Sequence, residues 1–325
     1  LVFGALPLVC DTDSSNSMLE HRFVIMGGPA RLLLSNNCSK RLDTVLATIL
    51  QELERIEEKF SFYKDSSLLS MINSTAGTGR SVAIDDEFSG LLHYADTLFR
   101  ESNGAFDPTA GVLKDIWNFQ QASLPNKKEL SKVLKYVDWG KFKWSCGHAS
   151  LPVRGMRIDL GGIIKEYAVD FAAKIIRDFK INSALVELAG DICVIGNKPN
   201  GFPWEISIRH PRKANQSAIL LKLTDISIAT SGDYERSFIL NGKRYSHLLN
   251  PITGYPIGGL ISTSVLSKQC LIAGGTATTA LLKEDRQGLE WLEKIGLPYL
   301  AIDSTLKMCG NMNTSLYSCS QEVFD

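Results

Sequence analysis

The chain has 325 residues, of which 44% are hydrophobic, so it can bury a large core in one domain or in two lobes. It carries 35 basic and 35 acidic side chains. No overall field therefore draws it to nucleic acid or to an anionic membrane, and a small ligand or a protein partner is favoured. No apolar run reaches the roughly 18 residues that a membrane span needs.

The cysteines and the N-terminus bear on the cellular compartment. The seven cysteines are scattered and never spaced as C-x-x-C, which argues against a zinc site or a disulfide framework and favours free thiols. The opening LVFGALPLVC is either the tail of a clipped secretory signal that ends in a lipid-acceptor Cys10 or an ordinary disordered or cloned N-terminus. We expect residues 1–20 to form a leader or linker.

The first half of the chain predicts a strand and then a mainly helical lobe, at about residues 40–120. His21–Leu34 is typical of a strand that is interrupted at Met26-Gly27-Gly28-Pro29. Apolar residues recur at helical spacing through Lys40–Phe60, which predicts an amphipathic helix. Asp86–Ser102 predicts a second helix. Asp107-Pro108 has the order of a cap followed by proline, which begins a third helix toward Trp117.

The second half, from about residue 150, predicts a sheet-rich lobe with one long helix, Ile163–Phe179. The dipeptide Asn241-Gly242 is typical of a tight hairpin between Tyr234–Leu240 and Lys243–Leu249. Further strands are predicted at Arg157–Leu160, Ala184–Leu188, Ile192–Ile195, Trp204–Arg209, Ile219–Leu223 and Ser227–Thr230. We treat residues 21–325 as a single domain.

A Gly-Gly turn precedes the long helix, in the stretch RIDLGGIIKEYAVDF. Glycines at a helix start let backbone N–H groups approach a phosphate, and Lys165 lies in the first turn. The dinucleotide fingerprint G-x-G-x-x-G is absent, so a plain strand-to-helix turn remains an alternative.

Two polar residues interrupt apolar strand patterns. Asp191 follows Gly190 within ALVELAGDICVIG, where a buried carboxylate needs a partner or a cation; a bulge with Asp191 facing solvent is the alternative. His247 lies in the second strand of the predicted hairpin, just before an Asn-Pro-x-Thr-Gly loop. It is a candidate general base or phosphate ligand, or else a structural histidine.

The stretch CLIAGGTATTALL at 270–282 combines two glycines with three threonines. It predicts either a loop that runs into a buried helix or part of a cation site. Its hydroxyls suit magnesium, but magnesium usually takes at least one carboxylate, and this stretch offers none.

Five sequence blocks, by their residues and their order, together resemble the FAD:protein FMN transferases. This is the ApbE family, once described as thiamine-biosynthesis lipoproteins. The blocks are FSFYKDSSLLSMIN (60–73), SNGAFDPTAGVLKDIW (102–117), IDLGGIIKEYAVD (158–170), LVELAGDICVIG (185–196) and ATSGDYERSFILNGKRYSHLLNPITGYPI (229–257). The resemblance implies an α+β fold with mixed or antiparallel sheets, packed helices and a deep FAD cleft between two lobes. It also implies transfer of FMN from FAD to a threonine hydroxyl of an acceptor protein, with release of AMP.

The resemblance also implies roles for individual residues. His247 accepts the incoming proton or holds the phosphate, and Lys165 neutralises phosphate charge. Asp107 is a helix cap that shapes the wall. The other implied FAD-binding positions are Met26, Tyr63, Gly161, Gly162, Asp191, Ser231, Asp233 and Tyr234.

The sequence departs from the family pattern at the implied magnesium site. The family pattern at this site is A-D-A-x-x-T. This chain has Gly274 at the position of the acid and Thr278 at the position of the threonine. The third implied ligand is a backbone carbonyl at Ile163 or Ile164, and we expect Ile164 and Thr278 to be the metal ligands. Asn250 stands where the family has an aspartate, and Met26-Gly27-Gly28 stands where it has Met-Gly-Thr.

Three hypotheses follow from the missing acid. The first is an active transferase in which Asp191, Asp159 or Asp233 holds the cation, or in which Thr278 and the FAD phosphates do. The second is a non-catalytic FAD-binding protein, and the third is an enzyme that hydrolyses FAD to FMN and AMP. The resemblance implies a membrane redox protein as acceptor and a periplasmic lipoprotein anchored in the inner membrane, with a cytoplasmic location as the alternative.

Overall fold

The protein is described here by a computed structural model, in which residues 18–35, 39–119, 121–213, 215–283 and 285–312 are placed. Its centre is one eight-stranded sheet in the order β1-β2-β6-β7-β10-β13-β14-β15. Every neighbouring pair in this sheet is antiparallel. The strands are β1 Met18–Ile25, β2 Gly28–Ser35, β6 Ala184–Leu188, β7 Asp191–Ile195, β10 Ile226–Gly232, β13 Leu260–Ser267, β14 Tyr299–Asp303 and β15 Met308–Gly310.

Three smaller antiparallel sheets accompany the central one among the described residues. The predicted hairpin closes at Asn241-Gly242, where both residues have positive φ, as a tight turn of this kind requires. The strands are β8 Trp204–Arg209 with β9 Ser217–Leu223, β11 Ser237–Leu240 with β12 Lys243–Ser246, and β3 Val82–Ala83 with β5 His148–Ser150 and β4 Lys143–Ser145.

The predicted helices form, with small differences in their bounds. The α-helices are α1 Ser39–Phe60, α2 Leu68–Asn73, α3 Asp86–Glu101, α4 Lys127–Val133, α5 Ile164–Asp178, α6 Cys270–Leu282 and α7 Asp285–Ile295. Pro108–Asp115 is the 3₁₀ helix η1, and short 3₁₀ turns occupy η2 Leu134–Tyr136 and η3 Trp139–Lys141. The side chain of Asp107 caps η1 by accepting a hydrogen bond from the Thr109 N–H at 2.7 Å, which confirms its predicted role.

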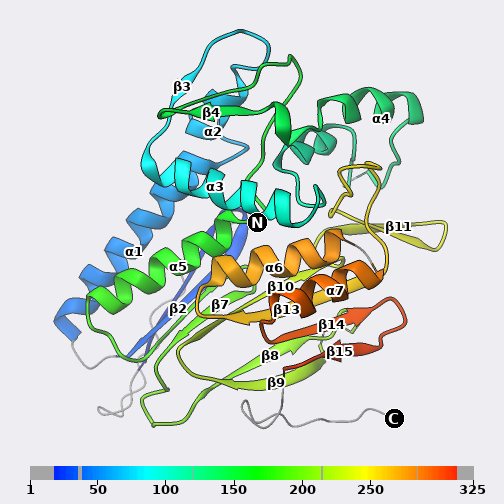
Figure 1. The fold of residues 1–325 in the computed structure, drawn as a ribbon. Coiled ribbons are helices and arrows are strands. Elements are labelled where there is room, and N and C mark those ends of the chain that lie inside the picture. Colours follow the sequence, from blue (N-terminus) through cyan, green and yellow to red (C-terminus); the bar gives the residue numbers. More distant parts are fainter. Residues whose placement is uncertain (1–17, 36–38, 120, 214, 284, 313–325) are drawn as a thin grey trace.

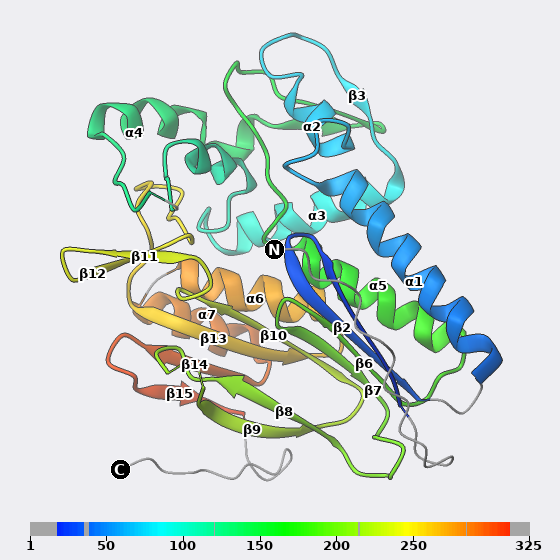
Figure 2. The same ribbon diagram turned by 180° about the vertical axis from the view of Figure 1, so that it is seen from behind.

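The central sheet is covered on both faces because side chains alternate along each strand. On β6, Val186 packs into the core formed with α1, α3, α5 and α6, whereas Leu185 packs against the β8–β9 hairpin. Figure 1 shows α5 and α6 lying across the sheet, below the lobe that contains α2, α3 and α4. Figure 2 shows β8 and β9 at the other side of the molecule. Helix α6 therefore lies at the junction between the helical lobe and the sheet.

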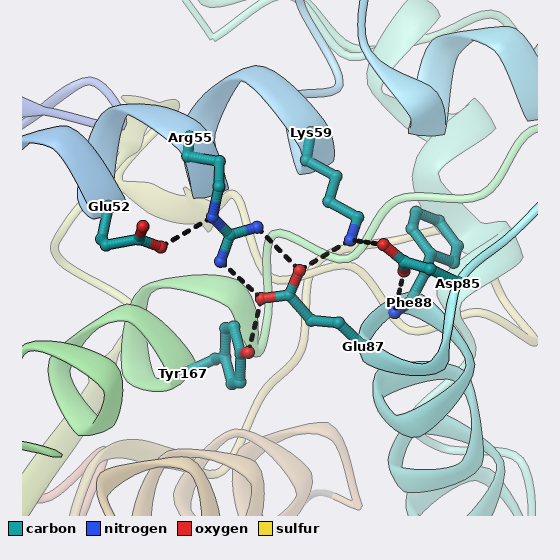
Figure 3. Close-up of polar contacts among 7 residues, drawn as sticks. All are labelled: Glu52, Arg55, Lys59, Asp85, Glu87, Phe88 and Tyr167. Carbon is teal, nitrogen blue, oxygen red and sulfur yellow. Dashed lines mark hydrogen bonds and ion pairs between the residues drawn. The ribbon is translucent and has the colours of Figure 1, made fainter.

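An ion-pair network ties α1, the start of α3 and α5 together beside this junction (Figure 3). Glu87 accepts hydrogen bonds from Arg55 at 2.8 Å, from Lys59 at 2.6 Å and from the Tyr167 hydroxyl at 2.7 Å. Partial burial works to raise the pKa of Glu87, but these donors outweigh it and lower the pKa to about 2. Glu87 is therefore a fully satisfied carboxylate.

One strand prediction is wrong, and one of the two alternatives for Asp191 is excluded. Residues 157–160 do not form a strand, because the N–H and carbonyl of Ile158 bond to the Asn73 side chain rather than to a neighbouring strand. Gly190-Asp191 is no bulge: Ala189 and Gly190, both with positive φ, form the turn between β6 and β7. Asp191 opens β7 with 4% of its surface exposed, so it does not face solvent.

The described residues include no helix that is long and apolar enough to cross a membrane. Four cysteines are described, namely Cys146, Cys193, Cys270 and Cys309, and all four are free thiols, as expected. Cys10, Cys38 and Cys319 lie outside the described residues, as does most of the expected leader.

Candidate active site

One large cavity of about 1030 Å³ opens between the helical lobe and the sheet. Its wall combines the β1–β2 turn, the segment after α1, the start of α5, the β6–β7 turn, strands β8 and β10, the segment after β12, and α6. Segments distant in the sequence therefore meet here. The volume lies at the upper end of the range for small-molecule sites, about 300–1000 Å³, so the cavity suits a ligand of dinucleotide size.

His247 faces this cavity directly after β12. Its backbone N–H donates to the Arg236 carbonyl at 2.8 Å, which fixes the segment, while its buried Nδ1 has no hydrogen-bond partner among the described residues. Burial and the nearby charge of Arg236 lower the pKa of His247 to about 4. The imidazole is therefore neutral at pH 7 and able to accept a proton.

Lys165, Glu166 and Asp191 form a cluster of ionisable side chains at the start of α5 and of β7. The Lys165 ammonium lies 3.7 Å from Asp191 Oδ2, which is long for an ion pair. Burial lowers the pKa of Lys165, but the carboxylates of Asp191 and Glu166 outweigh it, so Lys165 remains a cation. Burial raises the pKa of Asp191, and the charge of Lys165 partly offsets this.

Glu166 is the acidic side chain of this cluster whose carboxyl oxygens have the fewest hydrogen-bond partners. Only 4% of its surface is exposed, it lines the cavity, and its Oε2 has no hydrogen-bond partner among the described residues. Burial and the neighbouring charge of Asp191 raise its pKa well above the usual range. A buried carboxylate oxygen without a donor is costly unless a ligand completes it.

Helix α6 contributes the Thr278 hydroxyl to the same cavity, beside the Ser231 hydroxyl of β10. The Thr278 and Ser231 hydroxyls share a 2.7 Å hydrogen bond, and both residues line the cavity. Ile164, in the first turn of α5, lines it as well. The stretch Cys270–Leu282 is helical throughout, so its glycines lie inside a helix and not in a loop.

The structure brings most of the remaining predicted residues to the same cavity: Met26, Tyr63, Gly161, Gly162 and Tyr234. The Met26 N–H donates to Glu57 at 2.7 Å, which fixes the β1–β2 turn. Tyr63 is 72% exposed.

The Gly-Gly turn has fewer unused N–H groups than the sequence predicted. The Gly161 N–H donates to Asp159 at 2.8 Å, and the N–H groups of Ile163 and Ile164 both donate to the Leu160 carbonyl. These three groups stabilise the turn itself. In this arrangement the anion-binding role falls chiefly on Lys165.

Two predicted acids are already neutralised by other side chains. Arg212 donates two hydrogen bonds of 2.7 Å to the carboxylate of Asp233, which is not among the residues that line the cavity; its role as an FAD-binding residue stays a prediction. Asp159 lines the cavity, but it pairs with Lys114 and accepts from Gly161. Of the three acids proposed to hold a cation, only Asp191 keeps a weak, long ion pair.

The sequence model of the ApbE family matches residues 26–301. The chain belongs to the ApbE family. The FAD:protein FMN transferase of Haemophilus influenzae is 31% identical over 265 residues, which are 77% of this chain and 76% of that protein. The FAD:protein FMN transferase of Treponema pallidum is 30% identical over 266 residues, 73% of this chain and 72% of that protein.

Solved ApbE structures have the same fold. The ApbE protein of Thermotoga maritima is 30% identical and superposes with a TM-score of 0.83, over 92% of this chain and 99% of that one. The flavin transferase ApbE of Vibrio cholerae is 26% identical, also with a TM-score of 0.83, over 93% of this chain and 99% of that one. Both likenesses cover the two lobes that form the cavity.

Glu166 lines the cavity but was not among the site residues predicted from the sequence. The described residues contain no group of three or more His, Cys, Asp or Glu side chains arranged to hold a metal. The available signal was a glutamate three residues after Ile163, next to the apolar row of α5. Its position against α6 depends on tertiary packing, which the spacing does not contain.

Proposed function

We propose that this protein transfers FMN from FAD to a threonine hydroxyl of an acceptor protein. The threonine oxygen attacks the phosphorus of the FMN half and forms a phosphoester, the bridging P–O bond breaks, AMP leaves, and the threonine proton passes to His247. The observation that carries the proposal is the cavity of about 1030 Å³, which is lined by both the neutral His247 and the cationic Lys165. Family membership and the named FAD:protein FMN transferases support the same chemistry.

His247 is the proposed general base. Its unpartnered Nδ1 and its neutral state allow it to accept a proton, and the segment that carries it is fixed by the hydrogen bond to Arg236. A bound diphosphate would counter the cationic surroundings that lower its pKa. Removal of a general base typically costs about 10²–10⁴ in rate.

Lys165 and the start of α5 are the proposed phosphate-binding group. Lys165 keeps its charge inside the cavity and lies in the first helical turn, where the macrodipole also favours an anion. Met26, Tyr63 and Tyr234 offer side chains to the rings of FAD. Positioning and charge neutralisation are the main requirements for cleaving a pyrophosphate.

A magnesium ion fits the chemistry of the cavity wall. Magnesium prefers oxygen donors, and Thr278, Asp191 and the backbone of Ile164 supply them, next to a buried carboxylate oxygen of Glu166 that lacks a partner. When bound, the ion would neutralise charge that develops on the phosphates. The hydroxyl that would bind the ion, Thr278 Oγ1, is held by a hydrogen bond with Ser231.

The acceptor is proposed to be a membrane redox protein that carries the threonine. A periplasmic site of action, with a lipid anchor at Cys10, stays a prediction, as does the cytoplasmic alternative. Cys10 lies outside the described residues.

The test is the intact mass of a threonine-bearing acceptor domain after incubation with this protein, FAD and magnesium. The acceptor should gain one FMN with the unmodified protein, and His247→Ala should slow the gain by about 10²–10⁴. His148→Ala is the matched control, because His148 is exposed on β5 and lies outside the cavity wall. Free FMN and AMP without a mass gain would identify a pyrophosphatase, and FAD bound unchanged would identify a binding protein.

A further inference from the structure

Position 274 on α6 and position 166 on α5 occupy the same space. A Cβ built on Gly274 would lie 2.4 Å from Glu166 Cγ, 2.5 Å from its Oε1 and 2.7 Å from its Cδ. Real Cβ atoms do not approach other heavy atoms so closely. Glu166 therefore lies where it does only because residue 274 has no side chain.

The space that Glu166 fills is next to the residue that matches the family's metal-binding threonine. Thr278 lies one helical turn after Gly274 on α6 and faces the same cavity. An aspartate at 274 would project from α6 into the region that the Glu166 side chain now occupies. The two helices thus have room for one acidic side chain at this point of contact.

The Glu166 carboxylate also has what a cation ligand requires. It is 96% shielded from solvent, its Oε2 is unpartnered among the described residues, and it lines the cavity together with Asp191, Thr278 and Ile164. Glu87, Asp159 and Asp233 each accept hydrogen bonds from nearby donors, whereas the described residues offer no such donor to Glu166 Oε2. An oxygen-liganded divalent cation would complete it.

We propose that Glu166 supplies the carboxylate of the divalent-cation site, so that the acid comes from α5 in this chain instead of from position 274 on α6. Asp191 and Thr278 supply the other side-chain oxygens of the proposed cation site. This inference rests on the proposed function, because the substrate's phosphates would fill the remaining positions. It removes the reason to regard Gly274 as the loss of the metal site.

The experiment measures Mn²⁺ binding to the FAD-loaded protein by calorimetry and by the electron paramagnetic resonance of free Mn²⁺. Glu166→Gln, which keeps the shape of the side chain, should weaken Mn²⁺ binding about tenfold or more. Glu187→Gln is the matched control, because Glu187 lies at the same cavity but is paired with Arg31 at 2.8 Å; it should bind Mn²⁺ like the unmodified protein.

A positional exchange gives the second arm. Glu166→Gly should lose Mn²⁺ affinity, and Glu166→Gly combined with Gly274→Asp should recover most of it. A purely structural glutamate would not be replaced by an acid on another helix. Equal Mn²⁺ affinity of Glu166→Gln and the unmodified protein, no Mn²⁺ binding by the unmodified protein, or no recovery in the double variant would each overturn the inference.

FMN transfer is measured separately, so the two ideas can fail independently. Mn²⁺ binding that depends on Glu166, without a mass gain of any acceptor, would sink the transferase proposal and leave the metal site standing. FMN transfer that is accompanied by Mn²⁺ binding independent of Glu166 would do the reverse. Thermal unfolding of each variant checks that it folds.

Discussion

Two glutamates, Glu87 of α3 and Glu166 of α5, show opposite ways of burying a carboxylate. Glu87 meets Tyr167 of α5, together with Arg55 and Lys59, and these donors lower its pKa to about 2 (Figure 3). Glu166, the residue next to Tyr167, has a buried oxygen with no donor among the described residues, and its pKa is raised. The first carboxylate stabilises the fold, whereas the second is left for a ligand.

The difference comes from the surroundings on two sides of α5. The Tyr167 side faces α1 and the start of α3, where basic side chains gather. The Glu166 side faces α6 and the cavity, where the neighbours are Gly274, Thr278 and a second carboxylate, Asp191. The same residue type therefore serves stability on one side and binding on the other, and matched substitutions can separate the two.

The largest expected effect is on Glu87. Glu87→Ala should lower the free energy of unfolding by about 3 kcal/mol, because it leaves Arg55 and Lys59 without their shared partner. Glu87→Gln should cost about 2 kcal/mol. Urea denaturation at pH 7 measures both, with Glu52→Gln as the control, because within the described part of the chain Glu52 bonds only to Arg55. A Glu87→Ala variant as stable as the control would contradict the role given to the network.

The pH dependence of stability should report the same network. The folded pKa of Glu87, about 2, lies below its ordinary value of 4.5, so the stabilisation is complete above about pH 4.5 and is lost as the pH falls toward 2. Its size is about 3 kcal/mol, at 1.36 kcal/mol per pKa unit. Urea titrations from pH 7 to pH 2 should show this loss, and in Glu87→Gln the loss should be smaller by that amount.

Gly274→Ala tests the close contact between α5 and α6. The added methyl group would meet Glu166 at 2.4 Å, so we expect a loss of about 1–3 kcal/mol, typical of overpacking. Gly90→Ala is the control, because Gly90 is also inside a helix but has no heavy atom within 4 Å of an added Cβ. It should gain about 0.5–1 kcal/mol from helix propensity. Equal shifts in the two melting temperatures would contradict the contact.

Glu166→Gln should have the smallest effect on stability and the opposite sign to Glu87→Gln. A neutral amide avoids the cost of a buried negative charge beside Asp191, so the metal-free protein should gain up to about 1 kcal/mol. Chemical denaturation in the presence of a chelator measures this. A loss of about 2 kcal/mol, as expected for Glu87→Gln, would show that Glu166 has a structural partner after all.

Elements with their own periodicity or turn chemistry were predictable. The 22-residue α1, the Asp107 cap and the Asn241-Gly242 hairpin all depend on neighbours in the chain, and the structure confirms them. The strand predicted at 157–160 is wrong for the opposite reason. Its backbone partner is the Asn73 side chain, which no local pattern indicates.

The residues of the candidate site were predictable from the sequence, but the ion-pair partners of its acidic side chains were not. The blocks around Gly161, Asp191, Ser231 and His247 placed their residues at one cavity, as the resemblance implied. The ion pair of Asp233 with Arg212 was not predictable, because Arg212 lies outside those blocks. A carboxylate's availability depends on its partners, and those partners come from other segments of the chain.

The sequence by itself determined the ApbE fold, the residues around the cavity and the absence of an acid at position 274. Local propensity, hydrophobic spacing and family sequence motifs are all properties of the linear sequence. Only the tertiary structure decided that Glu166 fills the space above Gly274, because that depends on how closely α5 and α6 pack. Steric exclusion between two helices and the partners of a buried charge are properties of three-dimensional contact.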